Sequence, residues 1–141
     1  MAIGRKASST GGAVAIGDNA VASSLGIGIG AYASGTGVGS FALGTAALAS
    51  GNTSIAVGRQ SAATGNYSIA QGNVADAQGV NSIAMGNSAF ASSAGAIAIG
   101  ATNTSDSYSA TGQTLANAVN AIAFGANASA NADATNGVAI G

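Results

Sequence analysis

The chain has 141 residues, a formal net charge of -1, and charged side chains at only 5% of its positions. Aromatic residues make up 4%, too few to fill a thick globular core, and the near-neutral charge provides no basic patch for nucleic acid. Cys and His are absent, which excludes disulfides, thiolate chemistry and the usual zinc ligands and removes the commonest general base. No apolar run is long enough to predict a transmembrane helix.

The chain repeats a short segment that closes on Gly. Residues 81–86 read Asn-Ser-Ile-Ala-Met-Gly, and similar segments occupy 53–58, 67–72 and 95–100. The closing glycines are Gly4, Gly17, Gly30, Gly44, Gly58, Gly72, Gly86, Gly100, Gly125 and Gly141. They are 13 or 14 residues apart as far as Gly100, after which the intervals are 25 and 16. A fixed period of this length indicates a solenoid.

Each repeat is predicted to contain two short strands separated by turns. Its first half has apolar residues two positions apart, and its second half alternates small residues, as in Ala89 and Ala91. Because two such strands cannot form an independent sheet, each must pair in parallel with its counterpart in the next coil. The sequence therefore predicts an all-β parallel β-roll over residues 1–141, with about 14 residues per coil and about nine or ten coils. Since residues 1–4 and 138–141 both match the repeat, we expect a piece of a longer array.

The apolar pairs are expected to point into the roll, although periodicity alone also permits the reverse. The predicted core is Val14, Ile16, Ile27, Ile29, Phe41, Leu43, Ile55, Val57, Ile69, Ile83, Met85, Ile97, Ile99, Ile122 and Phe124. The Ala between each pair would then point outward and form a flat strip that packs against other copies of the chain. This predicted subunit face is Ala42, Ala56, Ala70, Ala84 and Ala98, extended by Ala15 and Ala123. Gly at each corner supplies the positive φ that a turn requires.

Two places depart from the repeat. Gln71 occupies an apolar position, either as a tolerated polar residue or as a polar layer that fixes register or binds an ion between subunits. The 25-residue interval adds 11 residues to the usual 14, which predicts an inserted loop within 101–120. Leu115 and Val119, four residues apart, would allow a short helical turn in it. An insertion in a solenoid often lies on the binding face, and covering a neighbouring chain is the other interpretation.

No catalytic, cofactor-binding or metal-binding residue is predicted. The four Asp are scattered singly, and the many Ser residues have no base beside them. Candidate ligand contacts are therefore surface residues of the insertion and of the second halves. They are Thr104, Asp106, Tyr108, Asn87 and Phe90, with Tyr32, Asn73, Asp76 and Ser88 as further solvent-facing candidates.

The recurring segment at 81–86, its period and its small-residue second half resemble the head repeat of YadA-like trimeric autotransporter adhesins of Gram-negative bacteria. The resemblance covers essentially the whole chain. It implies a left-handed β-roll, a parallel homotrimer and display on a surface fibre. It also implies adhesion to a host extracellular matrix protein, cell-surface receptor or glycan. The anchor in the outer membrane would belong to the parent protein, with no direct membrane insertion of these residues.

Four other classes fit the sequence less well. A left-handed β-helix acyltransferase has longer coils of six-residue repeats and generally needs a catalytic His, which this chain lacks. An ice-binding solenoid would have a regular Thr column, but Thr36, Thr45, Thr53 and Thr64 are irregularly placed. A disordered silk-like chain would lack the regular Ile and Val pairs. A purely structural spacer of the fibre is the remaining alternative.

Overall fold

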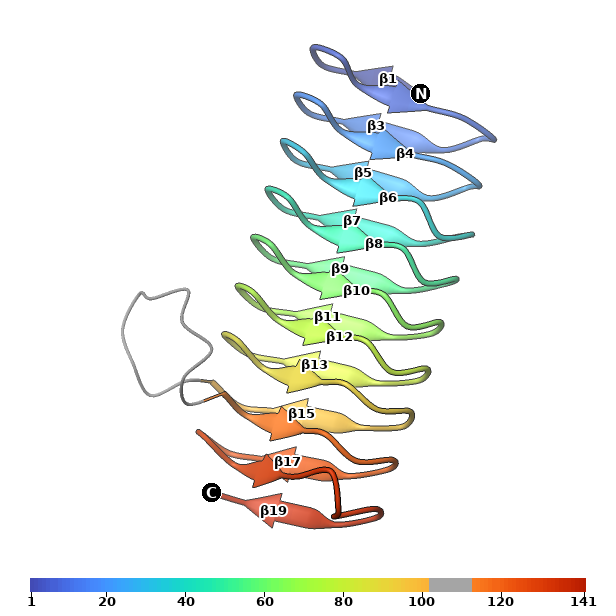
Figure 1. The fold of residues 1–141 in the computed structure, drawn as a ribbon. Helices are drawn as coiled ribbons and strands as arrows, with labels where there is room; N and C mark the ends of the chain where they lie inside the picture. The colour runs from blue at the N-terminus through green and yellow to red at the C-terminus, as the bar shows by residue number, and fades with distance from the viewer. Residues whose placement is uncertain (102–112) are drawn as a thin grey trace.

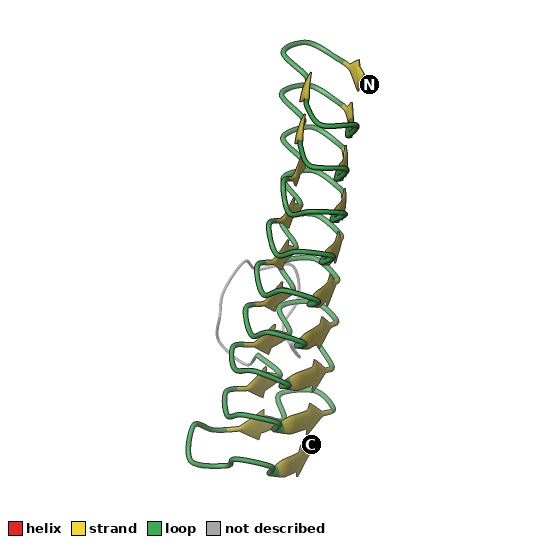
Figure 2. Cartoon of the chain, turned by 90° about the vertical axis from the view of Figure 1, so that its right-hand side faces the viewer, coloured by secondary structure: helices red, strands yellow, loops and turns green. Residues whose placement is uncertain are grey.

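A computed structural model describes residues 1–101 and 113–141, which wind into a parallel β-solenoid (Figure 1). The solenoid has about nine turns with a spacing near 14 residues, as the repeat predicts. Each complete coil contributes one strand to each of two facing sheets, and the coils stack along one axis from the N-terminus to the C-terminus. Figure 2 shows the two columns of strands from the side, joined by turns.

In the described residues one sheet has ten strands and the other has nine, all paired in parallel. The strands of the first sheet are β1 (Ala2–Ile3), β3 (Val14–Ile16), β5 (Ile27–Ile29), β7 (Phe41–Leu43), β9 (Ile55–Val57), β11 (Ile69–Gln71), β13 (Ile83–Met85), β15 (Ile97–Ile99), β17 (Ile122–Phe124) and β19 (Val138–Ile140). The strands of the second sheet are β2 (Ser8–Ser9), β4 (Val21–Ala22), β6 (Ser34–Gly35), β8 (Leu48–Ala49), β10 (Ala62–Ala63), β12 (Asp76–Ala77), β14 (Phe90–Ala91), β16 (Leu115–Ala116) and β18 (Ser129–Ala130).

The register places equivalent residues of successive coils directly beside one another. Ala70 pairs with Ala56 on one side and with Ala84 on the other. The amide of Gly72 donates to the carbonyl oxygen of Val57 at 2.8 Å, so neighbouring coils are held together by backbone hydrogen bonds. Pairing with the neighbouring coils therefore stabilises strands that are too short to be stable alone.

The core between the two sheets is built almost entirely from Ala. The central Ala of each first-sheet strand is fully buried in most coils, for example Ala42, Ala56 and Ala84. The second sheet faces it with another buried Ala column, which includes Ala63 and Ala77. The roll is therefore filled by methyl groups and has a very thin interior.

This packing reverses the predicted arrangement of the two faces. The apolar pairs expected in the core point outward and are half-buried or exposed: Val14, Ile16, Ile27, Ile29, Phe41, Leu43, Ile55, Val57, Ile69, Ile83, Met85, Ile97, Ile99, Ile122 and Phe124. The residues expected to form the subunit face are fully buried instead: Ala15, Ala42, Ala56, Ala70, Ala84, Ala98 and Ala123. The reason is the short distance between the sheets. At Gly28, for example, an added Cβ would lie only 2.8 Å from the carbonyl oxygen of Val21 in the second sheet, so a larger side chain could not fit there.

The closing glycines occupy the corner that follows each first-sheet strand. Gly58 has a φ of 129°, and an added Cβ would overlap the carbonyl oxygen of Gly72 in the next coil. The turn that begins at Gly58 is closed by a hydrogen bond from the Ser61 amide to the Gly58 carbonyl oxygen at 3.4 Å. Its third residue, Gln60, has a φ of 55°. The repeated Gly is thus required both by the backbone conformation and by the close approach of the next coil.

The Asn and Ser that open the repeated segment also have structural positions. Asn81 has a φ of 58°, a conformation that Asn tolerates better than most residues. Ser82 is fully buried at the start of the coil, as are Ser54 and Ser68 at the equivalent positions. The Ser68 hydroxyl donates to the carbonyl oxygen of Gly65 at 2.7 Å, which ties the turn to the strand that follows.

The 11 extra residues of the long interval fall in the first part of the predicted range 101–120. Strand β16 pairs in register with β14 and with β18, so Leu115 belongs to a regular coil and not to a helical turn. Thr114 is buried at the position that Ala89 holds one coil earlier. In the sequence the extra residues therefore lie between Gly100 and Thr114. The candidate ligand residues Thr104, Asp106 and Tyr108 lie outside the described residues.

Candidate interaction surfaces

The described part of the chain contains no pocket and no group of three or more His, Cys, Asp or Glu side chains that could hold a metal ion. No helix among the described residues has the length and hydropathy needed to cross a membrane. The outward faces of the two sheets and the corners between them are the candidate interaction surfaces.

The first sheet presents two parallel columns of apolar side chains to solvent. We call them the apolar ladder, and they are the outward residues of the three-residue strands β3 to β19. In this ladder Ile83 pairs in register with Ile69 and with Ile97, so like side chains stack from coil to coil. The exposed fractions include 39% for Ile55 and 55% for Phe124. Among the described strands of this set, Gln71 is the one outward residue that is not apolar.

The apolar ladder is too extended to be an incidental surface feature. Soluble monomers rarely expose contiguous apolar patches larger than a few hundred Å². The charged side chains of the described chain all lie elsewhere, at corners, on the second sheet and in a turn: Arg5, Lys6, Asp18, Arg59, Asp76 and Asp133. A flat, uncharged face that repeats the same side chains in every coil is suited to packing against another apolar surface of the same period.

The second sheet has a more polar and more varied outward face. Its first outward column is Ser8, Val21, Ser34, Leu48, Ala62, Asp76, Phe90, Leu115 and Ser129. Two residues further along each coil is a column of hydroxyl and amide side chains: Thr10, Ser23, Thr36, Ser50, Thr64, Gln78, Ser92, Asn117 and Asn131. The two outward faces of the roll therefore differ sharply in polarity.

Most of the described candidate ligand residues lie on one part of this second face and its corner. Phe90 points outward from β14, between Asp76 and Leu115 of the neighbouring coils. Asn87 lies at the preceding corner, where its Oδ1 accepts a hydrogen bond from Asn73 Nδ2 at 2.8 Å. Tyr32 is exposed in a more distant coil.

Ser88 does not belong to the solvent-facing set. Only 2% of its surface is exposed, because it lies within the turn between Asn87 and the buried Ala89. Its φ of 58° shows why the position is hard to judge from sequence. The third residue of a tight turn is recognised most readily when it is Gly or Asn.

Asp76 has an unfavourable environment on the second sheet. Its Oδ2 accepts a hydrogen bond from Gln78 Nε2 at 2.8 Å, whereas its Oδ1 is buried without a hydrogen-bond partner. Burial raises the pKa of the Asp76 carboxyl above 3.8, and the hydrogen bond from Gln78 offsets part of this shift. The ionised form is therefore held at a cost to the folded state.

Asp76→Asn is expected to stabilise the fold near neutral pH. Since the folded pKa is raised, protonation of Asp76 stabilises the wild type below 3.8, and this contribution is lost as pH rises through the folded pKa. The variant has no such loss and keeps an acceptor for Gln78. Urea unfolding should give a stability gain near neutrality that is larger than the gain below pH 3.8. Asp133→Asn, at an exposed carboxyl, is the control; an equal gain in both variants would contradict the assignment to burial.

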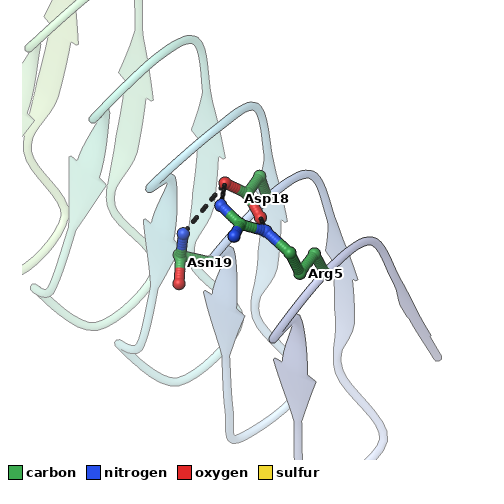
Figure 3. Close-up of polar contacts among 3 residues, drawn as sticks. All are labelled: Arg5, Asp18 and Asn19. Atoms are coloured by element: carbon green, nitrogen blue, oxygen red, sulfur yellow. Dashed lines mark hydrogen bonds and ion pairs between the residues drawn. The ribbon is translucent and has the colours of Figure 1, made fainter.

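One ion pair joins the first two coils (Figure 3). Arg5 Nε donates to Asp18 Oδ1 at 3.0 Å, and Arg5 Nη2 donates to Asp18 Oδ2 at 2.9 Å. Asn19 Nδ2 also donates to Oδ2, at 3.0 Å. The pKa of Arg5 is raised by its hydrogen bonds to Asp18. The pair is largely exposed, so it contributes little to stability and serves mainly to link equivalent corners.

These features define a repetitive β-solenoid with an Ala interior, one apolar outward face and one polar outward face. The family model for the YadA head domain repeat (2 copies) matches residues 11–26, 36–61, 49–75, 77–103, 112–128 and 116–141. The matched segments cover well over half of the chain, which therefore belongs to the YadA head family of trimeric autotransporter adhesins. No curated protein matches the chain.

Proposed function

We propose that the chain is the head of a Gram-negative surface adhesin and acts as a parallel homotrimer of left-handed β-rolls. The apolar ladder is the observation that carries this proposal, together with membership of the YadA head family. A single chain leaves residues such as Ile55, Ile122 and Phe124 substantially exposed. Covering these side chains removes apolar surface from water, which stabilises an assembly by about 25 cal/mol for each Å² buried.

A second and a third copy of the same chain suit the apolar ladder better than an unrelated partner. Copies that run in parallel have the same coil spacing, so every layer of one chain meets an equivalent layer of the next. Closed rotational symmetry then covers the ladder of each subunit completely. This proposal replaces the strip of Ala residues by the apolar pairs as the subunit face.

In such a trimer the second sheet and the corners remain available to ligand. Their side chains include Phe90, Asn87 and the hydroxyl and amide column that passes through Thr64 and Gln78. We propose attachment to a host extracellular matrix protein, cell-surface receptor or glycan, without catalysis or a cofactor. Three copies of a repeated face give many weak contacts whose combined strength exceeds that of any single one. The head would lie outside the bacterial outer membrane, with its anchor elsewhere in the parent protein.

The test has an assembly arm and a binding arm. Sedimentation equilibrium should give three times the chain mass, and a folded monomer at high concentration would contradict the assembly. Immobilised matrix proteins and host glycans should then capture the trimer in a dose-dependent way. Phe90→Ala and Asn87→Ala should reduce capture without changing the sedimentation profile of the trimer. A trimer that binds none of these surfaces would favour a structural spacer of the fibre.

A further inference from the structure

The Gln71 side chain interrupts the apolar ladder at the centre of the roll. It points outward from β11 and pairs in register with Val57 on one side and Met85 on the other. The residue is exposed, and its side-chain amide makes no hydrogen bond within the described part of the chain. Its backbone carbonyl oxygen accepts the usual ladder bond from Gly86 at 2.8 Å, so the strand itself is undisturbed.

If the apolar ladder were covered by another chain, burying the Gln71 amide there would cost free energy unless the amide formed hydrogen bonds across the interface. A primary amide carries a carbonyl acceptor and two N–H donors, and burying them unpaired is unfavourable. Three copies of Gln71 around an axis meet this requirement, because each carbonyl oxygen can accept from the next amide in a closed ring. Val57 and Met85, which flank it in the column, offer no side-chain donor.

The rest of the apolar ladder distinguishes one axial alignment from another only weakly. Successive layers are Ile55 with Val57, Ile69 with Gln71, Ile83 with Met85, and Ile97 with Ile99. If one chain slipped by a coil, which is about 4.8 Å along the axis, Ile would again meet Ile. Elsewhere the layers differ in the size of the side chain and not in its polarity, as at Phe41 and Phe124.

We propose that the Gln71 residues of three chains form a hydrogen-bonded layer that fixes the axial register of the trimer. A chain displaced by one coil would place its amide against Val57 or Met85 of its neighbours and leave all of its amide groups unpaired. One polar layer in an otherwise apolar interface specifies register in this way at some cost in stability. The inference rests on the proposed trimer, because the site is incomplete without the other two copies.

The variant Gln71→Leu tests the proposal because it should loosen the axial alignment of the chains while making the trimer more stable. Disulfide trapping measures the alignment. Chains carrying Ile55→Cys are mixed with chains carrying Ile83→Cys, refolded together and mildly oxidised. In register these positions are two coils apart, about 9.6 Å along the axis, which is beyond the reach of a disulfide. A one-coil slip in the direction that brings them together reduces this separation to about 4.8 Å along the axis, which is compatible with a disulfide.

With Gln71 present we expect almost no disulfide between the two kinds of chain. With Gln71→Leu in both chains we expect that product to rise at least tenfold and the melting temperature of the trimer to increase. Ile69→Leu, in the same strand, is the control and should change neither readout, while circular dichroism checks the strand content. A Gln71→Leu trimer with no increase in the mixed disulfide would overturn the register role alone. A monomeric wild type would overturn the proposed assembly as well.

Discussion

Gly58→Ala is expected to destabilise the fold by about 3 kcal/mol or more, because backbone strain and overpacking act together. Gly58 has a φ of 129°, and an added methyl would overlap the backbone carbonyl of Gly72. Neither group is a flexible side chain, so the stacked coils would have to separate at this corner. Urea unfolding followed by circular dichroism measures the loss.

Gly39→Ala is the matched control for this substitution. Gly39 also has positive φ, of 64°, but nothing lies within 4 Å of an added Cβ. Side chains are tolerated at its equivalents Thr53, Tyr67 and Asn81, which have φ values of 53°, 59° and 58°. We expect a cost of about 1 kcal/mol there. Equal losses in Gly58→Ala and Gly39→Ala would show that close contact between coils is not what requires Gly58.

Ile83→Glu is expected to weaken the trimer roughly a thousandfold or more while leaving each chain folded. The side chain points out of the roll, so a carboxylate there does not enter the Ala core. In the proposed trimer three carboxylates would be buried in one layer, and each buried ion without a partner costs several kcal/mol. The sedimentation profile of the variant should be that of a monomer with the strand content of the wild type.

Phe90→Glu places the same charge on the opposite face of the same coil. Phe90 is half-buried in the single chain, as Ile83 is, but it belongs to the second sheet. The Phe90→Glu variant should therefore leave the trimer intact. If the two variants dissociated equally, the apolar ladder could not be the subunit face, and a trimeric Ile83→Glu protein would lead to the same conclusion.

The solenoid itself could be predicted from the sequence because its period is explicit. Segments that recur every 13 or 14 residues and are too short for a separate sheet leave stacked parallel strands as the stable solution. The direction of the faces could not be derived from alternation, because a period of two defines two faces without saying which is inside. That choice is made by the distance between the sheets, a tertiary quantity.

A signal for the correct choice was nevertheless present. Ala is the central residue in nearly every first-sheet strand, whereas the flanking positions vary from Phe41 to Ile55 to Gln71. An interior that admits only a methyl explains constant Ala, and a surface explains why Gln is accepted. Similarly, the alternation of Thr114, Ala116 and Ala118 continues the buried pattern of earlier coils and identifies where the regular roll resumes.

The proposed ligand surface was less predictable than the scaffold. Recognition on a flat repeated face depends on side chains that hold nothing together, and no local pattern distinguishes them from other solvated residues. Phe90 is proposed as a ligand contact because it lies in a second half that is expected to face solvent, and the structure places it half-buried on β14. The unpaired Oδ1 of Asp76 depends on how neighbouring coils cover that carboxyl and has no sequence signature.

The corner after Gly100 shows how such an array can diversify. Lengthening the path between paired coils from 14 to 25 residues costs only about 0.5 kcal/mol in closure entropy, because that cost grows with the logarithm of length. The strands on either side keep their register. Corners can therefore accept new sequence almost independently of the strands, so the outer surface of such an array can vary while the two stacked sheets keep their register.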